Sequence, residues 1–379
     1  MDFMLSDQDR QFRDHCRRFA QDILAPLAAR YGETQDVPAE LVAAMARAGL
    51  FTLLLPKELG GPGVRALPIC LAREELAGVY CPADVTLAMQ GLGGYPIYLA
   101  GSSAQQEKYL GPIGRGEMLA SFALTEAGAG SDVNAMQSQA VERDGGFVLN
   151  GSKLFISNGY AAQFITTFVK TPQPGNPRAM SAFIVDKGTP GFKVARRLEL
   201  IAPHDLTALE FKDCFLPREN LLGQVGQGFK IAMQTLEVLR MSVGAAAVGI
   251  GRAALAAALD YAQRRVQFGA PIADFQATQF KLAEMATELD AARALVYRAA
   301  IKKDGGLARA ARDASMAKLY ATEAAQRVVD QAVQIHGGVG LLKGSAVERL
   351  YREIRALRIY EGTSEIHKLI IARSLLAKA

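Results

Sequence analysis

The spacing of apolar residues along the chain separates three regions. In the first region, one series of apolar residues recurs every three or four positions, as on one face of a helix: Phe12, Cys16, Phe19, Ile23 and Leu27. Ser6 followed by Asp9 resembles a capping box at the start of that helix. The pattern predicts an N-terminal helical domain over residues 1–117.

Short apolar runs bounded by Gly and Pro replace this period between residues 118 and 225. The runs 146–149 and 152–156 flank Asn150-Gly151, a dipeptide that favours a tight primed turn, so we expect a hairpin there. Further strands are expected at 164–169, 182–185 and 209–211. Several short strands at this spacing favour a small antiparallel barrel or sandwich.

The third region, residues 226–379, is rich in alanine and leucine with long helical periods. Three long helices are expected, each ending at a glycine-containing turn: 228–266, 273–303 and 307–335. Long helices joined by short turns form antiparallel bundles, so the region predicts a four-helix bundle. The whole chain is therefore expected to be α+β and mainly α, with three domains at 1–117, 118–225 and 226–379.

Composition narrows the function classes. Half of the residues are hydrophobic, which allows large cores, and 43 Lys+Arg against 38 Asp+Glu give a net charge of +5 without a basic tract for nucleic acid. The four cysteines form no CxxC pair, which favours reduced thiols over a zinc site or disulfides. We see no signal-peptide core and no apolar run long enough to span a bilayer, so we expect a soluble, cytoplasmic protein.

The most informative stretch is Arg358-Ile359-Tyr360-Glu361-Gly362-Thr363-Ser364-Glu365-Ile366. It places a lone carboxylate, Glu361, directly before a helix start that Thr363 or Ser364 would cap. A glutamate at such a position is ordinarily a solvated surface residue, so the motif alone does not define a site.

A second motif changes that interpretation. Leu124-Thr125-Glu126-Ala127-Gly128-Ala129-Gly130-Ser131-Asp132 is a Gly/Ser/Thr-rich loop suited to a phosphate-bearing or heterocyclic cofactor. Together the two motifs resemble those of the acyl-CoA dehydrogenase family, flavoenzymes of the short- and medium-chain type. The resemblance covers essentially the whole chain, because the helical, β and bundle regions follow the domain order of that family.

The resemblance implies a reaction and a base. In the family, a glutamate in a Tyr-Glu-Gly-Thr context removes the α-proton of an acyl-CoA thioester, and FAD accepts the β-hydrogen as hydride. Glu361 matches that glutamate, and its backbone N–H would be one donor to the thioester oxygen. Some members carry the base on the first bundle helix, but Leu239 occupies that position here, directly before Arg240.

The resemblance also assigns cofactor and substrate residues. Those that match FAD-binding positions are Leu124, Thr125, Ser131, Phe155, Ser157, Arg265, Phe268, Gln276, Gln334, Gly337, Gly338, Thr363 and Glu365. Those expected to contact the acyl-CoA substrate are Ser131, Arg240, Tyr360 and Gly362. Arg265 and Phe268 match a motif that reaches the FAD of a neighbouring subunit, which implies a homotetramer built as a dimer of dimers. An electron-transferring flavoprotein is the implied electron acceptor.

Two departures from the family pattern bear on specificity. The loop Leu200-Ile201-Ala202-Pro203-His204-Asp205-Leu206 is one residue longer than in relatives, and His204-Asp205 could line an altered pocket. Asp84 stands where glutaryl-type relatives place an arginine for the distal carboxylate of the substrate. A negative charge there would repel a dicarboxylic monoester, so glutaryl-CoA is an improbable substrate.

Other functions of the same fold stay open. An oxidase that uses dioxygen is one alternative, and a nitroalkane-oxidising relative is disfavoured because it uses aspartate where this chain has Glu361. A non-catalytic interaction protein on the same scaffold is the third class. Acyl chain length and branching depend on the shape of the pocket and do not follow from the motifs.

Overall fold

The computed structural model describes residues 5–307 and 310–377. The chain divides into two compact units, which are described separately below. The first unit comprises Met1–Arg30, Arg65–Asp84 and Glu237–Ala379, and the second comprises Tyr31–Val64 and Val85–Leu236. The expected class is confirmed, since helices precede and follow a β region.

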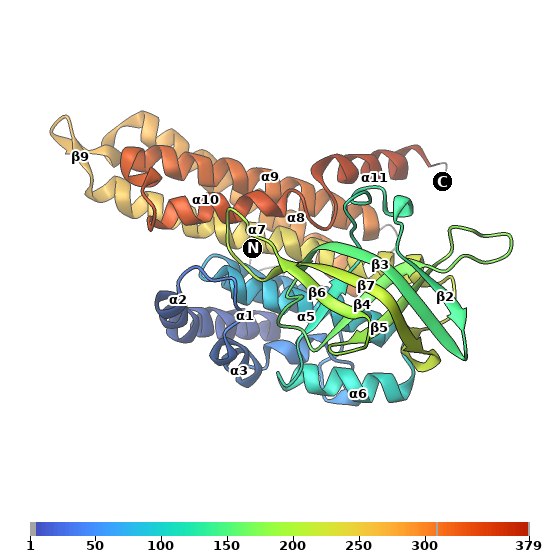
Figure 1. Ribbon diagram of the computed structural model, residues 1–379. Coiled ribbons are helices and arrows are strands. Elements are labelled where there is room, and N and C mark those ends of the chain that lie inside the picture. Colours follow the sequence, from blue (N-terminus) through green and yellow to red (C-terminus); the bar gives the residue numbers. More distant parts are fainter. Residues whose placement is uncertain (1–4, 308–309, 378–379) are drawn as a thin grey trace. The chain divides into compact units, whose positions relative to one another are not determined.

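Long helices dominate the first unit (Figure 1). Its helices, two of which extend beyond the unit, are α1 (Asp7–Phe19), the π-helical η2 (Ala20–Leu24), α2 (Ala25–Tyr31), α4 (Ala66–Ala77), α7 (Gly228–Arg264), α8 (Gln276–Asp304), α9 (Ala310–His336), α10 (Ala346–Leu357) and α11 (Ser364–Leu376). The three long helices expected in the third region are confirmed as α7, α8 and α9. Alanine and branched aliphatic residues of α7 to α10 form one buried cluster, the core of the predicted bundle.

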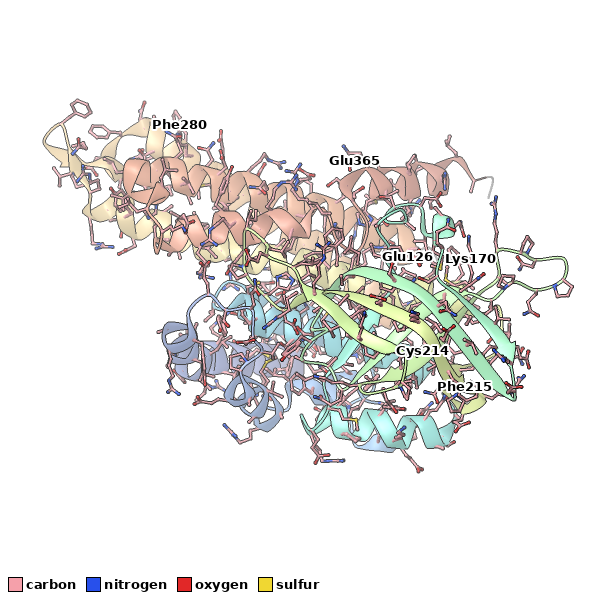
Figure 2. The ribbon with its side chains drawn as sticks, in the orientation of Figure 1. Glu126, Lys170, Cys214, Phe215, Phe280 and Glu365 are labelled. Carbon is pink, nitrogen blue, oxygen red and sulfur yellow. The ribbon has the colours of Figure 1, made fainter. Side chains whose placement is uncertain are left out.

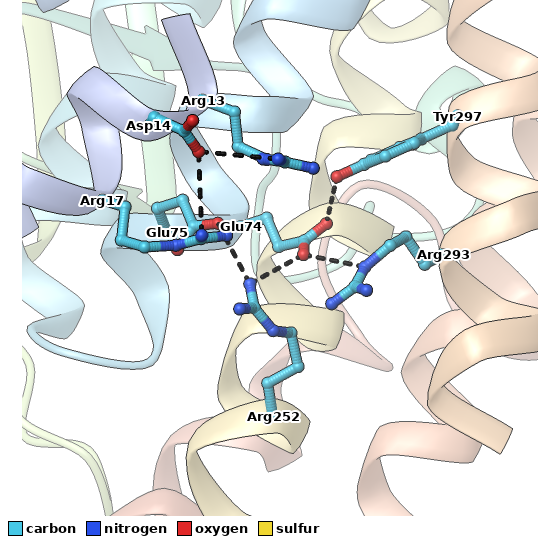
Figure 3. Close-up of polar contacts among 8 residues, drawn as sticks. All are labelled: Arg13, Asp14, Arg17, Glu74, Glu75, Arg252, Arg293 and Tyr297. Atoms are coloured by element: carbon cyan, nitrogen blue, oxygen red, sulfur yellow. Dashed lines mark hydrogen bonds and ion pairs between the residues drawn. The ribbon is translucent and has the colours of Figure 1, made fainter. Parts of the chain in front are cut away.

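Helices α4 and α7 approach closely where glycine permits it. A Cβ placed on Gly249 of α7 would lie 2.1 Å from the Glu74 carbonyl oxygen. Beside this contact the buried Glu74 carboxylate accepts from Arg252, Arg293 and Tyr297, each at 2.9 Å (Figure 3). The charge of Glu74 is therefore fully compensated inside the bundle, as a buried carboxylate requires.

The N-terminal stripe is confirmed with one correction. Ser6 and Asp9 form a capping box, and Cys16, Phe19 and Leu27 are buried as expected. Ile23, however, is 46% exposed, and Leu24 is buried instead. The π-helical segment η2 adds residues to one turn, which moves the apolar face by one position.

The second unit combines short helices with a β-sheet (Figure 1). Its helices are α3 (Ala39–Arg47), α6 (Ser103–Gly114) and all but the first turn of α5 (Cys81–Ala100). Its strands are β1 (Ala120–Ala123), β2 (Gln139–Arg143), β3 (Gly146–Ser157), β4 (Phe164–Lys170), β5 (Met180–Asp186), β6 (Phe192–Arg197), β7 (Leu206–Pro217) and β8 (Leu221–Leu222). The sheet order is β6-β7-β3-β2-β4-β5-β8, with β1 parallel to β4. The sheet is thus mostly antiparallel, although β2 also meets β4 in parallel.

The predicted hairpin at Asn150-Gly151 is wrong. Strand β3 continues through this dipeptide, and its pairing with β7 shifts register between Leu149 and Gly151, as at a β-bulge. The hairpin turn is Asp144-Gly145, where both residues have positive φ and Arg143 pairs with Gly146. Both dipeptides suit a primed turn, and the pairing of β3 with β7 on both sides of Asn150-Gly151 keeps that dipeptide within the strand.

Helix α7 is the one described helix that is long and apolar enough to cross a membrane by length and composition. Its most apolar stretch is 67% buried within the protein, as in the core helix of a bundle. The four cysteines are all free.

Candidate active site

Glu361 lies in the short connection between α10 and α11. Thr363 caps α11, and its side chain accepts from the Ile366 amide. Glu361 itself has φ of +53°, a left-handed conformation that costs energy for a residue with a side chain, and Gly362 follows with φ of +99°. The connection therefore turns sharply at the glutamate instead of extending the helix before it.

One oxygen of the Glu361 carboxylate is not hydrogen-bonded to any described residue. This oxygen, Oε2, is buried. Burial raises the pKa of Glu361, while Arg73, Arg240 and Lys318 act in the opposite direction. A buried carboxylate with a free oxygen and a raised pKa is suited to accept a proton.

Two cations contact the consecutive backbone carbonyl groups of Glu361 and Gly362. The Arg240 Nε atom of α7 lies 3.4 Å from the Glu361 carbonyl oxygen, and Lys318 Nζ of α9 donates to the Gly362 carbonyl oxygen at 2.7 Å. Arg240 was expected at the substrate and is brought to the base. Leu239 is buried, which agrees with the assignment of the base to Glu361 and not to α7.

A buried ion pair between Arg73 and Asp84 lies in the first unit and acts on Glu361. Arg73 of α4 donates from Nε and Nη2 to the two carboxylate oxygens of Asp84, at 2.7 and 2.8 Å, and from Nη1 to Ser242 at 2.8 Å. The premise of the Asp84 prediction was therefore wrong, because this carboxylate is neutralised and does not present a free negative charge. The low turnover of glutaryl-CoA stays a prediction without that support.

Three residues of this site were missed from the sequence. Arg73 and Lys318 lie far from Glu361 along the chain, and no local motif marks them. His367 of α11 is fully buried, and its ring lies close to Gly362. Burial lowers the pKa of His367 to about 3, so it is neutral at physiological pH.

The predicted flavin loop belongs to the second unit. The loop follows β1 and includes Glu126 (labelled in Figure 2). The Glu126 carboxylate accepts from the buried Lys153 at 2.8 Å and from the Ser138 amide at 3.1 Å. Lys153 also donates to the Leu124 carbonyl oxygen at 3.1 Å. Ser131 is exposed at the far end of the loop. The ion pair fixes the loop, while Ala127, Gly128, Gly130 and Ser131 stay exposed.

Strand β3 presents Phe155 and Ser157 in the same unit. The pairing of β3 with β7 is irregular between Lys153 and Ile156, and Phe155 has φ of +58° and is 57% exposed. An exposed phenyl ring on a strained bulge is a surface on which a planar ring can stack. Ser157 Oγ lies 3.4 Å from His204 Nε2, so the longer loop does bring His204 to a predicted flavin residue. Asp205 instead accepts from the Tyr160 and Ala161 amides.

The remaining predicted cofactor residues gather at one end of the bundle. Tyr261 near the end of α7 stacks on His336 at the end of α9, with ring centroids 4.4 Å apart. The predicted cofactor residues at this end are all exposed, namely Arg265, Phe268, Gln276, Gln334, Gly337 and Gly338. Phe268, with φ of +51°, is 97% exposed.

This end is far from Glu361 in the same chain. Lys318, which contacts the Glu361 connection, and His336 are 336 − 318 = 18 residues apart on α9, which at about 1.5 Å per residue is roughly 27 Å. The first unit thus brings together Glu361, Arg240 and Gly362 but not the Arg265 group. Thr363 and Glu365 lie at the N-terminus of α11 beside the base, and Glu365 is exposed (Figure 2).

Comparisons with known proteins agree over the full chain. Family models for the N-terminal, middle and C-terminal domains of acyl-CoA dehydrogenase match residues 6–117, 121–214 and 226–376. An acyl-CoA dehydrogenase of Bacillus subtilis (strain 168) is 41% identical over 375 residues, 98% of this chain and 99% of that protein. The caffeyl-CoA reductase-Etf complex subunit CarC of Acetobacterium woodii is 40% identical over 380 residues, 98% of this chain and 99% of that protein.

A solved structure gives the same result. Butyryl-CoA dehydrogenase from Megasphaera elsdenii superimposes with a TM-score of 0.93 at 39% identity, covering 99% of this chain and 100% of that one. The chain belongs to the acyl-CoA dehydrogenase family. Members of this family are FAD-dependent oxidoreductases that act on CH–CH groups.

Proposed function

We propose that the protein catalyses the 2,3-dehydrogenation of an acyl-CoA thioester to the trans-2-enoyl-CoA, with Glu361 as the base. The observation that carries the proposal is the Glu361 carboxylate, which has a buried, unpartnered Oε2 and a pKa raised by burial. Family membership supplies the substrate class, and the identity of the acyl group is left to experiment.

The chemistry follows from the position of the charges. Glu361 takes the α-proton, a double bond forms between the α- and β-carbons, and the β-hydrogen leaves as hydride, for which bound FAD supplies the acceptor. Arg73, Arg240 and Lys318 favour the ionised carboxylate, so that the base can act although it is buried. The Glu361 N–H is proposed to donate to the thioester oxygen, where negative charge develops.

Residues suited to parts of FAD occur in each unit and are considered separately. In the second unit the Leu124–Ser131 loop, Phe155 and Ser157 suit the ring system, because the loop is fixed from behind and the phenyl ring is exposed. In the first unit, Thr363 and Glu365 lie at the N-terminus of α11, where the helix dipole favours an anionic group.

The test is Glu361→Gln, which preserves shape but cannot accept the proton. With FAD content unchanged, flavin bleaching by a panel of acyl-CoA thioesters under anaerobic conditions should fall by about 10²–10⁴. Glu107→Gln, at an exposed position of α6, is the matched control and should bleach at the native rate. Near-native bleaching by Glu361→Gln would refute the assignment, and a panel in which glutaryl-CoA is best would refute the expected preference for monoacyl thioesters.

An electron-transferring flavoprotein is proposed as the acceptor, because the CarC relative is named as a subunit of an Etf complex. That relative is also named a reductase, which makes reduction of a 2-enoyl-CoA by the same site the second candidate. Reoxidation of the reduced protein separates these possibilities: rapid reoxidation by air indicates an oxidase, by electron-transferring flavoprotein a dehydrogenase, and by enoyl-CoA alone a reductase. A purified protein that never binds flavin would favour the non-catalytic alternative. A cytoplasmic location is proposed on the same grounds as the sequence prediction.

A further inference from the structure

Lys318 is a buried ammonium group that forms no ion pair with any residue the structure describes. Its side chain is completely buried in α9, and the hydrogen bond to the Gly362 carbonyl oxygen is its one polar contact within the described residues. The other fully buried lysine, Lys153, instead lies 2.8 Å from the Glu126 carboxylate. Burying an unpaired charge costs several kcal/mol, so the absence of a paired carboxylate at Lys318 calls for a reason.

The carboxylate that acts most strongly on Lys318 is that of Glu361. Burial lowers the pKa of Lys318 to about 8, and the strongest opposing influence is Glu361. The interaction is mutual, because Lys318 is among the cations that lower the pKa of Glu361. The ammonium thus binds the backbone immediately after the base and acts electrostatically on the base itself.

We infer that Lys318 is a positioning residue for Glu361: its ammonium fixes the Gly362 peptide group and supplies a positive charge beside the carboxylate. The inference rests on the proposed role of Glu361 as the base. The left-handed φ of Glu361 persists only if surrounding contacts hold it. A charged donor at 2.7 Å from the Gly362 carbonyl oxygen is a strong contact of this kind.

Other charged and titratable groups also surround Glu361. Those on the surrounding helices are Arg73, Asp84, Arg240, Glu323, Glu365 and His367. The arginines stay charged. Asp84 is paired with Arg73, Glu323 is paired with Arg358, and His367 stays neutral. Arg73 is held in an ion pair, whereas Lys318 forms none among the described residues, so removing Lys318 changes the charge around Glu361 without breaking an ion pair.

The experiment is Lys318→Met, which keeps length and apolar volume but removes the charge and the donor. Without the cation, Glu361 holds a proton more tightly, so a larger fraction of the base is protonated at a given pH. In anaerobic single-turnover flavin reduction, the acid limb of the pH–rate profile should move up by roughly one to two pH units. Substrate affinity should change less than the reduction rate. Lys302→Met removes a half-buried lysine of α8 that is paired with Asp313 and is not among the groups that act on Glu361, so it should leave the profile unchanged.

A second readout is independent of turnover. Thermal unfolding at neutral pH gives the difference in Tm between the protein with Glu361 and the Glu361→Gln variant. This difference should be larger in the Lys318→Met background, because the ionised carboxylate loses a stabilising neighbour. If Lys318→Met fails to fold, Lys318→Gln, which keeps a donor but no charge, is measured in the same way and should show the same shift. A profile lowered equally at every pH, or an unchanged stability difference, would overturn the inference.

The two failures are distinguishable. If Glu361→Gln reduces flavin at the native rate, the proposed function is wrong. If Glu361→Gln is inactive but the Lys318 variants keep the native acid limb, the role of Lys318 alone is wrong.

Discussion

Arg73 and Asp84 form a bidentate ion pair in which both side chains are almost completely buried, and Ser242 accepts a third hydrogen bond from Arg73. The pair links α4 to the start of α5. Its two charges also act on Glu361 with opposite signs, Arg73 lowering and Asp84 raising the pKa of the base. The pair therefore contributes both to the stability of the first unit and to the electrostatics of the site.

Removing one member should be strongly destabilising. Asp84→Asn leaves the Arg73 guanidinium buried without a counter-charge, and breaking a buried pair in this way costs about 3–5 kcal/mol. Denaturant unfolding of the native and variant proteins measures this cost. Asp260→Asn, which breaks an exposed pair with Arg264, should cost far less, because solvent screens that pair. Equal effects of the two substitutions would contradict the structural role of the Arg73–Asp84 pair.

The base should destabilise the fold at neutral pH. Because burial raises the pKa of Glu361, the folded protein holds the proton more readily than the unfolded chain. Ionisation therefore costs stability as the pH rises through the raised pKa, and this cost vanishes below the ordinary pKa of glutamate. Glu361→Gln should accordingly have a higher Tm than the native protein at neutral pH, with the difference shrinking on acidification. A difference that is constant with pH, or a lower Tm at neutral pH, would show that burial does not penalise the carboxylate.

Local signals in the sequence predicted the parts of the fold that depend on neighbouring residues. The Ser6–Asp9 capping box, the Thr363 cap and the glycine-terminated long helices all follow from short-range rules. The hairpin failed because two dipeptides, Asn150-Gly151 and Asp144-Gly145, satisfy the same turn rule, and pairing with β7 decides between them. The position of Ile23 failed because a π-helical turn has no clear sequence signal.

The site divides in the same way. Glu361 and its cap occur in one continuous motif, which is why they could be found. Arg73 and Lys318 reach the connection between α10 and α11 from α4 and α9, which are distant in the sequence. A lysine or arginine in a helix is ordinarily exposed, so the sequence does not indicate that these two are buried. Asp84 was identified as a specificity position, but its partner was not, and the sign of its effect depends on that partner.

The last prediction concerns Arg265, which follows α7 and is exposed at the end of the bundle. Helix α9 reaches the same end roughly 27 Å from the contact between Lys318 and the Glu361 connection. This separation supports the proposal that Arg265 binds the FAD of a neighbouring subunit in a homotetramer, since closed symmetry gives each subunit one donated and one received contact. Arg265→Ala would remove a charge-assisted hydrogen bond to the diphosphate, worth about 1.5–3 kcal/mol. The variant should lose FAD on dilution and regain it with excess cofactor. Arg264→Ala, which removes the adjacent exposed arginine paired with Asp260, is the matched control and should retain FAD. Sedimentation and flavin absorbance measured together test the proposal, and a stable, fully flavinylated monomer of the native protein would refute it.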